Sequence, residues 1–273
     1  MSDHYIHGFS DAERERLIAQ AEILSGPVFG GLDFSADQHL LEVGCAVGAE
    51  LHLIAQRAPH LTLTGLDLSG VHLRAGRAWL EDQERVRLVQ GDAHALPFAD
   101  DSFDVGMTIW LLEHVADAAG VVAELLRVVK PTGRVILTEV DNATFGFEPP
   151  QPAIAAWWEA FNRCQAEMGG GDPFVGRKLR RIAESLGAKV LTEEPRPVIA
   201  SGDVTRARDV QLYYLRDLLE SGADRLLASG YATLDMLDAM AAAFDAVQAT
   251  TEVVFQYSAV RLICRMPRRP SAG

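Results

Sequence analysis

The pattern of hydrophobic positions in the first half of the chain predicts short strands that alternate with helices. Nearly continuous apolar runs occupy residues 40–43, 61–66, 86–90, 105–110 and 135–140, as expected for strands covered on both faces of a sheet. Residues 49–57, 71–81 and 117–129 carry apolar positions at helical spacing between these runs. This alternation predicts an α/β fold with a doubly wound, mostly parallel sheet.

The turn that follows the first predicted strand consists of small residues. Residues 39–50 have the sequence HLLEVGCAVGAE, in which Gly44, Cys45, Ala46 and Gly48 lead into a helix. Such a turn is typical of nucleotide-binding units, because small residues let the backbone approach a ligand and the helix offers free N–H groups. The glycine series is incomplete, since Ala46 stands where a second glycine is expected.

Acidic residues lie at the ends of the first three predicted strands. Glu42 belongs to the first strand, Asp67 ends the second and Asp92 follows the third, at a regular spacing. Ligands of open α/β sheets lie across the carboxyl ends of the strands, where an acidic residue can accept hydrogen bonds from ribose hydroxyls. The three carboxylates are therefore predicted to lie in one binding site.

Several motifs in order resemble class I S-adenosylmethionine (SAM) dependent methyltransferases, nearest to the ubiquinone and menaquinone branch with a type 11 methyltransferase domain. The motifs occupy residues 42–48, 65–69, 91–98, 101–105, 112–115 and 126–134. The resemblance implies a Rossmann-like doubly wound sheet of seven mostly parallel strands with an antiparallel last strand, covered by a helical cap. A nicotinamide oxidoreductase would explain Asp67 but not residues 96–104.

The resemblance also implies a cofactor site for SAM, with S-adenosylhomocysteine as product. Glu42 would support the amino group, Asp67 the ribose diol, and Asp92 the adenine amino group. The remaining residues implied near the cofactor are Gly44, Cys45, Ala46, Gly48, Leu68, Ala93, Ile109 and Trp110.

Residues 9–24 predict an amphipathic helix that begins at the N-cap Ser10, with Glu13 completing a capping box. The resemblance implies that this segment is a lid, in which Tyr5 and Gln20 approach the methionine end of SAM. An ordinary amphipathic helix is an equal alternative.

The second half of the chain departs from strict alternation. We expect an N-terminal lid at 1–34, a SAM-binding core at 35–141 that resumes at 176–202 and 251–266, and a tail at 267–273. Residues 142–175 and 203–250 are predicted to be inserted segments that together form a helical cap. Long insertions on the ligand side of such sheets usually build substrate pockets.

Candidates for the acceptor side of the site come from the end of the fourth strand and from the cap. His114 is the catalytic candidate, because a histidine there can take a proton from a hydroxyl or an amine; a scaffold role is the alternative, and Glu113 is equally consistent with a solvated turn. The predicted substrate pocket contains Glu139, Asn142, Trp157, Phe161, Tyr213 and Tyr214. The alternatives are solvated strand ends for the polar residues and core positions for the aromatic ones, and Arg177 is expected at the surface.

Composition narrows the range of partners. The formal net charge of −13 argues against nucleic-acid binding. Three cysteines without paired spacing indicate neither disulfides nor zinc, which favours a reducing cytoplasm, and the scattered histidines predict no metal site. We expect no signal peptide and no membrane span. The protein is expected to be a monomer or a homodimer.

The sequence as a whole predicts a methyltransferase that acts on O or N, and possibly C, of a small-molecule metabolite. The principal alternative is a protein of the same fold that uses SAM for non-methyl chemistry or as a structural support, because fold does not determine function.

Overall fold

The computed structural model describes residue 7, residues 10–201 and residues 205–267 of the 273-residue chain. One predicted site residue, Tyr5, lies outside the described residues.

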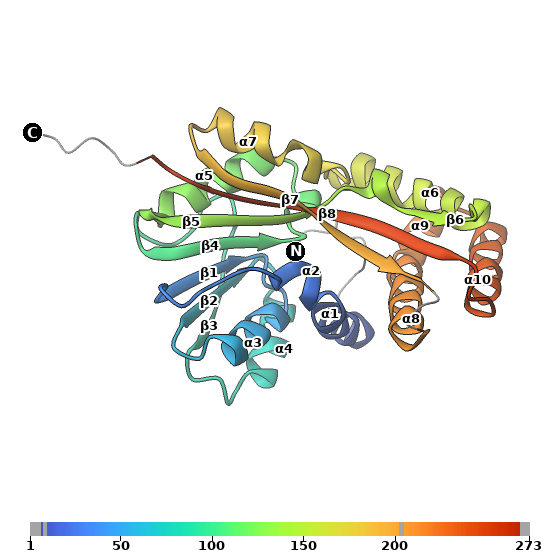
Figure 1. The fold of residues 1–273 in the computed structure, drawn as a ribbon, viewed down its shortest axis with the longest axis horizontal. Coiled ribbons are helices and arrows are strands. Elements are labelled where there is room, and N and C mark those ends of the chain that lie inside the picture. Colours follow the sequence, from blue (N-terminus) through green and yellow to red (C-terminus); the bar gives the residue numbers. More distant parts are fainter. Residues whose placement is uncertain (1–6, 8–9, 202–204, 268–273) are drawn as a thin grey trace, which may run out of the picture.

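The described part of the chain contains an eight-stranded sheet with the predicted doubly wound order (Figure 1). Strands β3, β2, β1, β4 and β5 follow one another across the sheet, and each adjacent pair is parallel. Their bounds are His39–Val43 for β1, Thr62–Asp67 for β2, Val86–Gln90 for β3, Phe103–Ile109 for β4 and Val129–Val140 for β5. The predicted positions of these strands are confirmed, although β5 begins earlier than predicted, directly after its preceding helix.

The last strand, β8 (Val254–Arg265), is antiparallel to β5, as predicted. Strand β7 (Lys189–Ala200) pairs along the other side of β8, so β7 forms the outer edge where the sequence placed the last strand. The predicted loop after β5 contains a short strand, β6 (Gly146–Glu148), which pairs with the beginning of β8. This extra strand accounts for the difference from the seven strands expected.

Helices cover both faces of the sheet because successive strand residues point to opposite sides. Leu40 packs in a cluster with Leu51 and Ile54 of α3 (Ala49–Arg57), whereas Leu41 packs with Val121 and Leu125 of α5 (Ala118–Val128). Helix α4 (Gly70–Trp79) lies on the α3 side, and α7 (Leu179–Ser185) lies on the α5 side (Figure 1).

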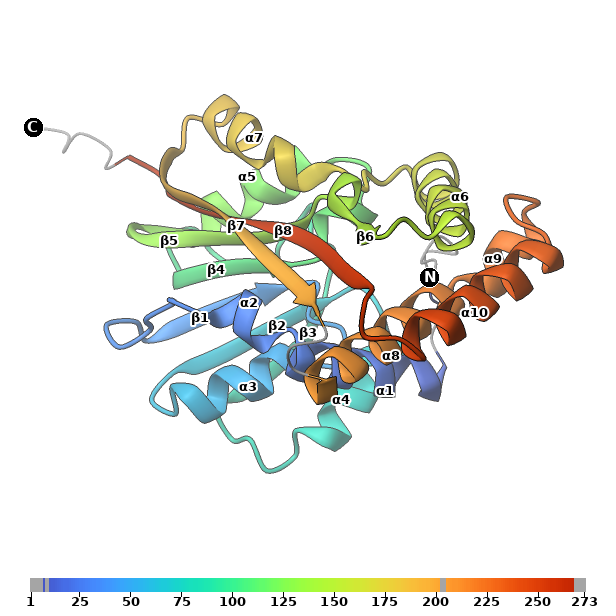
Figure 2. The same cartoon turned by 45° about the vertical axis from the view of Figure 1, so that its right-hand side comes forward.

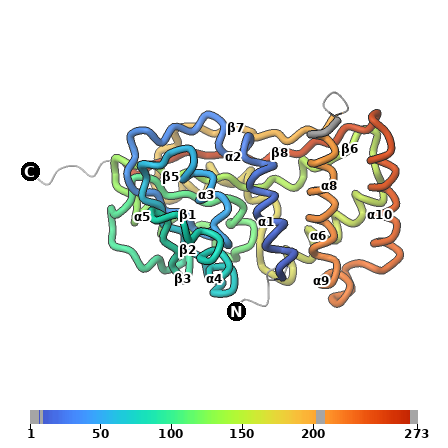
Figure 3. The backbone as a smooth tube through the Cα atoms, turned by 90° about the horizontal axis from the view of Figure 1, so that it is seen from below, coloured from blue at the N-terminus to red at the C-terminus, as the bar shows by residue number. Residues whose placement is uncertain are grey.

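Four helices extend beyond the carboxyl ends of the central strands (Figure 2). They are α6 (Pro152–Gly169), α8 (Thr205–Ser221), α9 (Ala223–Ala228) and α10 (Leu234–Gln248). Helix α1 (Asp11–Ile23), followed by α2 (Ser25–Phe29), lies between the sheet and α8 (Figure 3). Phe244 of α10 and Leu40 of β1 belong to one continuous buried cluster, so these helices share a core with the sheet.

Three 3-10 turns connect these elements, at Leu112–His114, Asn142–Thr144 and Val175–Lys178. The first two follow β4 and β5 directly. They therefore place short polar segments at the carboxyl edge of the sheet, beneath the cap.

Candidate active site

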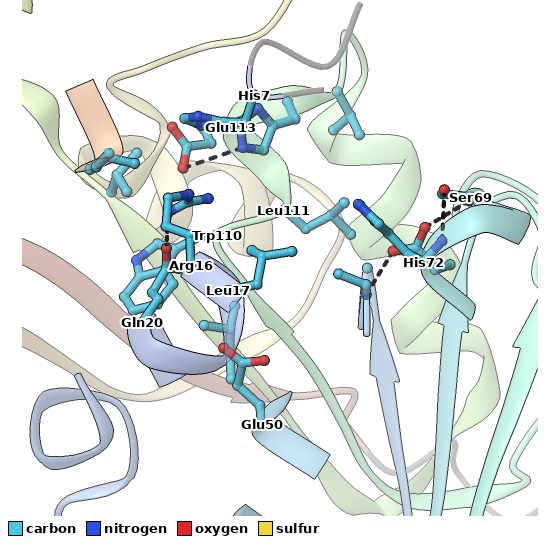
Figure 4. A pocket seen from close by; sticks show the side chains of 18 of the residues that line it. His7, Arg16, Leu17, Gln20, Glu50, Ser69, His72, Trp110, Leu111 and Glu113 are labelled. Atoms are coloured by element: carbon cyan, nitrogen blue, oxygen red, sulfur yellow. Dashed lines mark hydrogen bonds and ion pairs between the residues drawn. The ribbon is translucent and has the colours of Figure 1, made fainter. Parts of the chain in front are cut away.

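A cavity of about 750 Å³ opens at the carboxyl ends of the central strands. This volume lies within the range of small-molecule and cofactor sites. Helix α1 contributes Arg16, Leu17 and Gln20, and the cap contributes Phe161 and Tyr214. Figure 4 shows Arg16, Gln20 and Trp110 on one side of the pocket, away from Ser69 and His72. The cavity therefore joins the small-residue turn after β1 to a chamber under the cap.

The turn after β1 has the unusual backbone that its small residues predicted. Gly44, Ala46 and Gly48 have φ values of +79°, +45° and +75°. A Cβ atom added at Gly44 would lie 2.8 Å from Cδ1 of Leu111, so this position requires glycine. Gly44 and Ala46 line the cavity, whereas the described cavity lining does not include Gly48, which caps α3, or the buried Cys45.

Asp67 lines the cavity, and backbone N–H groups of two turns hold its carboxylate in place. Its Oδ2 accepts a hydrogen bond of 2.8 Å from the N–H of Ala46, and its Oδ1 accepts one of 2.7 Å from the N–H of Ser69. The carboxylate thereby connects the turn after β1 to the turn after β2. Leu68 also lines the cavity and is largely exposed.

Asp92 and Ala93 line the rim of the same cavity. The Oδ1 atom of Asp92 accepts a hydrogen bond of 2.9 Å from the N–H of His94, and this bond lowers the pKa of the carboxyl group. Because Asp92 is exposed to solvent, its remaining oxygen atom is available to a ligand at the rim.

Two glutamates lie beneath the turn. Glu42 is buried, and its Oε2 atom has no hydrogen-bond partner among the described residues. Burial, followed by the negative charges of Glu50 and Asp67, raises the pKa of Glu42 well above its usual value. Glu50 lines the cavity from the first turn of α3, and burial raises its pKa to about 7. Glu50 was not among the predicted site residues. An acid in the first turn of the helix that follows the small-residue turn could have indicated it, because acidic side chains are favoured at helix N-termini.

Helix α1 contributes a network of buried polar side chains. The Nε and Nη2 atoms of Arg16 each donate a hydrogen bond of 2.7 Å to Glu13, and Nη1 donates one of 2.8 Å to Gln20. The hydroxyl of Tyr214 also donates to Oε1 of Gln20, at 2.9 Å, which joins α1 to α8. Gln20 therefore lies in the cavity lining, as predicted, and Arg16 is a neighbour that the sequence did not single out.

The N-terminus of α1 has the expected cap. The N–H of Glu13 donates to the Ser10 hydroxyl at 3.1 Å. The Glu13 carboxylate, which a complete capping box would direct to the Ser10 backbone, pairs with Arg16.

Glu113 and His114 both face the cavity from the 3-10 turn after β4. Glu113 is only 8% exposed, so the solvated-turn alternative is wrong, and burial raises its pKa to about 7. Burial, together with the nearby positive charge of Arg16, lowers the pKa of His114 to about 4. Nε2 of Gln165 in α6 donates to Oε2 of Glu113 at 2.8 Å.

Of the residues predicted for the substrate pocket, Asn142, Phe161 and Tyr214 line the cavity. The described lining does not include the other three, Glu139, Trp157 and Tyr213. Trp157 is fully buried in the cap, and Tyr213, one position before Tyr214 on the helix, points to solvent with 59% exposure.

Glu139 lies beneath the cavity and supports the loop after β4. Its carboxylate accepts hydrogen bonds from the Thr108 hydroxyl at 2.7 Å and from the N–H of Leu112 at 3.0 Å. Burial raises the pKa of Glu139 to about 8, although these donors favour its ionised form.

Stacked aromatic rings form one wall of the chamber. The Phe145 and Trp158 rings are 4.4 Å apart and nearly parallel, and Trp158 stacks in turn on Phe161 at 5.4 Å. The indole N–H of Trp158 donates to the backbone carbonyl of Asn142, which fixes the central ring. Phe145 and Tyr257 also line the cavity, and sequence analysis missed both because only tertiary folding brings their segments to it.

Two residues at the end of β4 belong to the cavity. Ile109 and Trp110 line the cavity, as expected. Arg177 pairs with Asp141 at 2.7 Å and is half-exposed.

No cluster of metal-ligating side chains occurs in the described ranges. Within those same ranges, no helix has the length and hydrophobicity needed to cross a membrane.

The doubly wound sheet, its small-residue turn and the acids that end β1 and β2 define the class I methyltransferase fold. Residues 41–137 match the family model described as a methyltransferase domain.

Sequence relatives extend the match beyond the domain. A demethylmenaquinone methyltransferase of Clavibacter sepedonicus is 30% identical over 131 residues, which cover 48% of this chain and 50% of the relative. An uncharacterized 37.1 kDa protein of a Streptomyces fradiae transposon is 31% identical over 165 residues, covering 60% of this chain and 47% of the relative. The chain thus spans about half the length of these curated relatives.

Solved structures confirm the fold. A phosphoethanolamine N-methyltransferase of Haemonchus contortus, in complex with S-adenosylhomocysteine, has a TM-score of 0.55 at 16% identity, covering 93% of this chain and 53% of that one. The [4+2]-cyclase SpnF has a TM-score of 0.54 at 19% identity, covering 94% and 82% of the two chains.

Proposed function

We propose that this protein transfers a methyl group from SAM to an oxygen or nitrogen atom, or to a carbon atom, of a small molecule, releasing S-adenosylhomocysteine. The observation that carries the proposal is the single cavity that connects Gly44, Asp67 and Asp92 to a chamber lined by aromatic rings. The match of residues 41–137 to the methyltransferase domain model and the similarity to methyltransferases support the same activity.

Residues in and beside the cavity could contact three parts of a SAM molecule. Gly44 and Ala46 line the cavity without bulky side chains, so a ligand can lie against the backbone of the turn. Asp67 offers its remaining acceptor capacity to a ribose diol. Glu42 Oε2 and the indole Nε1 of Trp110 are buried polar atoms without partners among the described residues, as expected beside the charged amino-acid end of such a cofactor.

When bound, SAM supplies an electrophilic methyl group on a positively charged sulfur. The contribution of the protein is then to align an acceptor in line with that methyl group and to exclude water. Helices α1, α6 and α8 enclose the chamber, and the stack of Phe145, Trp158 and Phe161 offers a flat apolar surface to the acceptor. We further propose that the cap segments 142–175 and 203–250 select the acceptor, while 35–141 holds the cofactor.

Two measurements test this function. Isothermal titration calorimetry should show saturable binding of SAM and of S-adenosylhomocysteine. Methyl-labelled SAM should then transfer its label into at least one compound of a broad panel of small hydroxylated and amine metabolites. Absence of binding at millimolar concentrations contradicts the proposal, and protection against thermal unfolding by NADH instead would favour an oxidoreductase.

The alternative is a SAM-binding protein whose chemistry is not methyl transfer. The structural likeness to SpnF, which is described as a [4+2]-cyclase, favours keeping this candidate. Tight binding of SAM together with no labelled product across the panel would support the alternative.

A further inference from the structure

Two ionisable side chains next to each other face the chamber. Glu113 and His114 both belong to the 3-10 turn after β4, and both line the cavity. Figure 4 shows Glu113 beside the pocket. Burial affects them in opposite ways, because a glutamate loses its charge on taking up a proton whereas a histidine gains one.

His114 is poorly suited to accept a proton in this environment. Uptake would create a buried cation near Arg16, and the pKa of His114 is accordingly lowered to about 4. A positively charged sulfonium in the same cavity would oppose that cation further.

Glu113 is suited to accept a proton because it is buried. Its pKa is raised to about 7, so that it is partly ionised near neutral pH and becomes neutral on protonation. Gln165 holds Oε2 at 2.8 Å, and Oε1 lies 3.7 Å from Nε2 of His114. The carboxylate is thus oriented by α6.

Charged and titratable groups from several elements influence this carboxylate. Arg16 of α1 lowers its pKa, and Gln165 of α6 does so by its hydrogen bond. Glu113 in turn raises the pKa values of three groups that are near enough to interact with it: Glu139 of β5, Tyr214 of α8 and Tyr257 of β8. The pKa of Glu113 is nevertheless raised, because the effect of burial outweighs those of Gln165 and Arg16.

The chamber around Glu113 selects for flat, uncharged molecules. Phe161 and Trp158 offer stacked faces, and Tyr214, Tyr257 and Asn142 offer polar groups at the edges. Two arginines belong to the described lining: Arg16, which pairs with Glu13, and the exposed Arg74 of α4. The negative charge of an anionic acceptor would therefore have little positive charge to pair with in the chamber, and burying an unpaired charge is costly.

Resting on the methyl transfer proposed above, we propose that Glu113 accepts the proton of a hydroxyl group on a flat, uncharged, apolar acceptor. The hydroxyl oxygen forms a bond to the methyl carbon while the methyl–sulfur bond breaks and its electron pair stays on sulfur. The hydroxyl proton passes to Oε1 of the Glu113 carboxylate, the oxygen to which Gln165 does not donate. Gln165 is then a positioning residue, and His114 stays neutral.

A pair of probes tests the acceptor class and the role of Glu113 together. The probes are 2-naphthol and 2-methoxynaphthalene, which differ in one methyl group and in the ability to donate a hydrogen bond. Their affinities are measured by calorimetry at pH 8 with saturating S-adenosylhomocysteine, which lacks the transferred methyl and leaves room for the ether. The wild-type chain should bind the naphthol about tenfold or more tightly than the ether, as for a hydrogen bond to a charged acceptor.

Three variants separate the possible acceptors of the hydroxyl proton. Glu113→Gln should abolish the preference for the naphthol, whereas His114→Asn should retain it. Glu22→Gln, the same chemical change at an exposed position of α1, is the matched control and should also retain it. In the wild-type chain the preference should decrease as the pH falls through about 7, the pKa of Glu113.

The outcomes distinguish this inference from the proposed function. Normal binding of S-adenosylhomocysteine without a naphthol preference, or a preference that disappears in His114→Asn but persists in Glu113→Gln, overturns the role of Glu113 alone. Tighter binding of 2-naphthylamine than of 2-naphthol overturns the assignment to hydroxyl acceptors. Failure to bind S-adenosylhomocysteine at all overturns the proposed function itself. If Glu113→Gln does not fold, the pH dependence of the wild-type preference decides the question.

Discussion

At the scale of single residues, Ala46 shows how the turn after β1 functions without a full glycine series. Its φ of +45° lies in the left-handed region, which glycine adopts more readily than alanine. The N–H of Ala46 donates to Oδ2 of Asp67, and this hydrogen bond helps to hold the unusual backbone. Asp67 therefore shapes the turn in addition to its proposed contact with the ribose.

Substitution Asp67→Ala should weaken binding of S-adenosylhomocysteine by about 1–3 kcal/mol, because the ribose and the N–H of Ala46 lose a partly buried acceptor. Calorimetry measures the loss. Asp92→Ala is the comparison, and it should cost less since Asp92 is exposed and its hydrogen bonds compete with water. Unchanged affinity in Asp67→Ala would refute our placement of the ribose.

At the scale of elements, the cap is held together by aromatic side chains that also resemble ligand-binding residues in sequence. Trp157 of α6 is fully buried, and its indole N–H donates to the carbonyl of Leu219 in α8 at 3.0 Å. Trp158, the next residue, lines the cavity. Adjacent aromatic residues on one helix thus divide between the core of the cap and the site.

We expect Trp157→Phe to destabilise the protein by about 1–3 kcal/mol, because the Leu219 carbonyl loses its donor in a buried place. Urea unfolding measures this, with the exposed Tyr213→Phe as a control that should change stability little. Affinity for S-adenosylhomocysteine should stay the same in both variants. A large loss of affinity in Trp157→Phe would show that the cap core and the cofactor site are coupled.

At the scale of the whole molecule, buried acids accumulate around one cavity. Burial raises the pKa of Glu50 and Glu113 to about 7 and that of Glu139 to about 8, from an ordinary value of 4.5. Each group therefore binds its proton more tightly in the folded state than in the unfolded chain. Their stabilising contribution is complete below pH 4.5 and is lost as the pH rises through 7 to 8.

The ligand-free protein should accordingly be less stable at pH 8 than at pH 6.5, a range in which the lowered pKa values of His7, His72 and His114 oppose this trend little. Each carboxyl group that stays protonated only in the folded state contributes a slope of about 1.4 kcal/mol per pH unit. Urea unfolding across this range measures the slope, which Glu113→Gln should reduce. Carboxyl groups with lowered pKa values, such as Asp92 and Asp104, change the stability only at pH values below this range. A stability that rises steadily with pH would contradict the prediction.

Much of the fold and the cofactor side of the site followed from local patterns. The helix at 49–57 and the strand at 86–90 were predicted with the bounds that the structure shows. Gly44, Ala46, Asp67, Asp92 and Ala93 line the cavity as expected, since the ends of parallel strands necessarily meet at one edge of a sheet.

The acceptor side was predictable only in part. Periodicity places Tyr213 and Tyr214 on a helix, but it does not say which of the two faces a cavity that α1 and α8 form together. Glu113 appears as a turn residue in sequence, but it is buried in the structure, where α6 brings Gln165 to its carboxylate.

The sequence by itself determined the order of strands and helices, the small-residue turn and the acids that end the strands, because these depend on spacing and on local backbone preference. Tertiary structure alone decided which aromatic rings form the chamber and which acids are buried. Burial and pKa depend on what distant segments pack against a side chain, and the sequence does not encode those contacts in any short pattern.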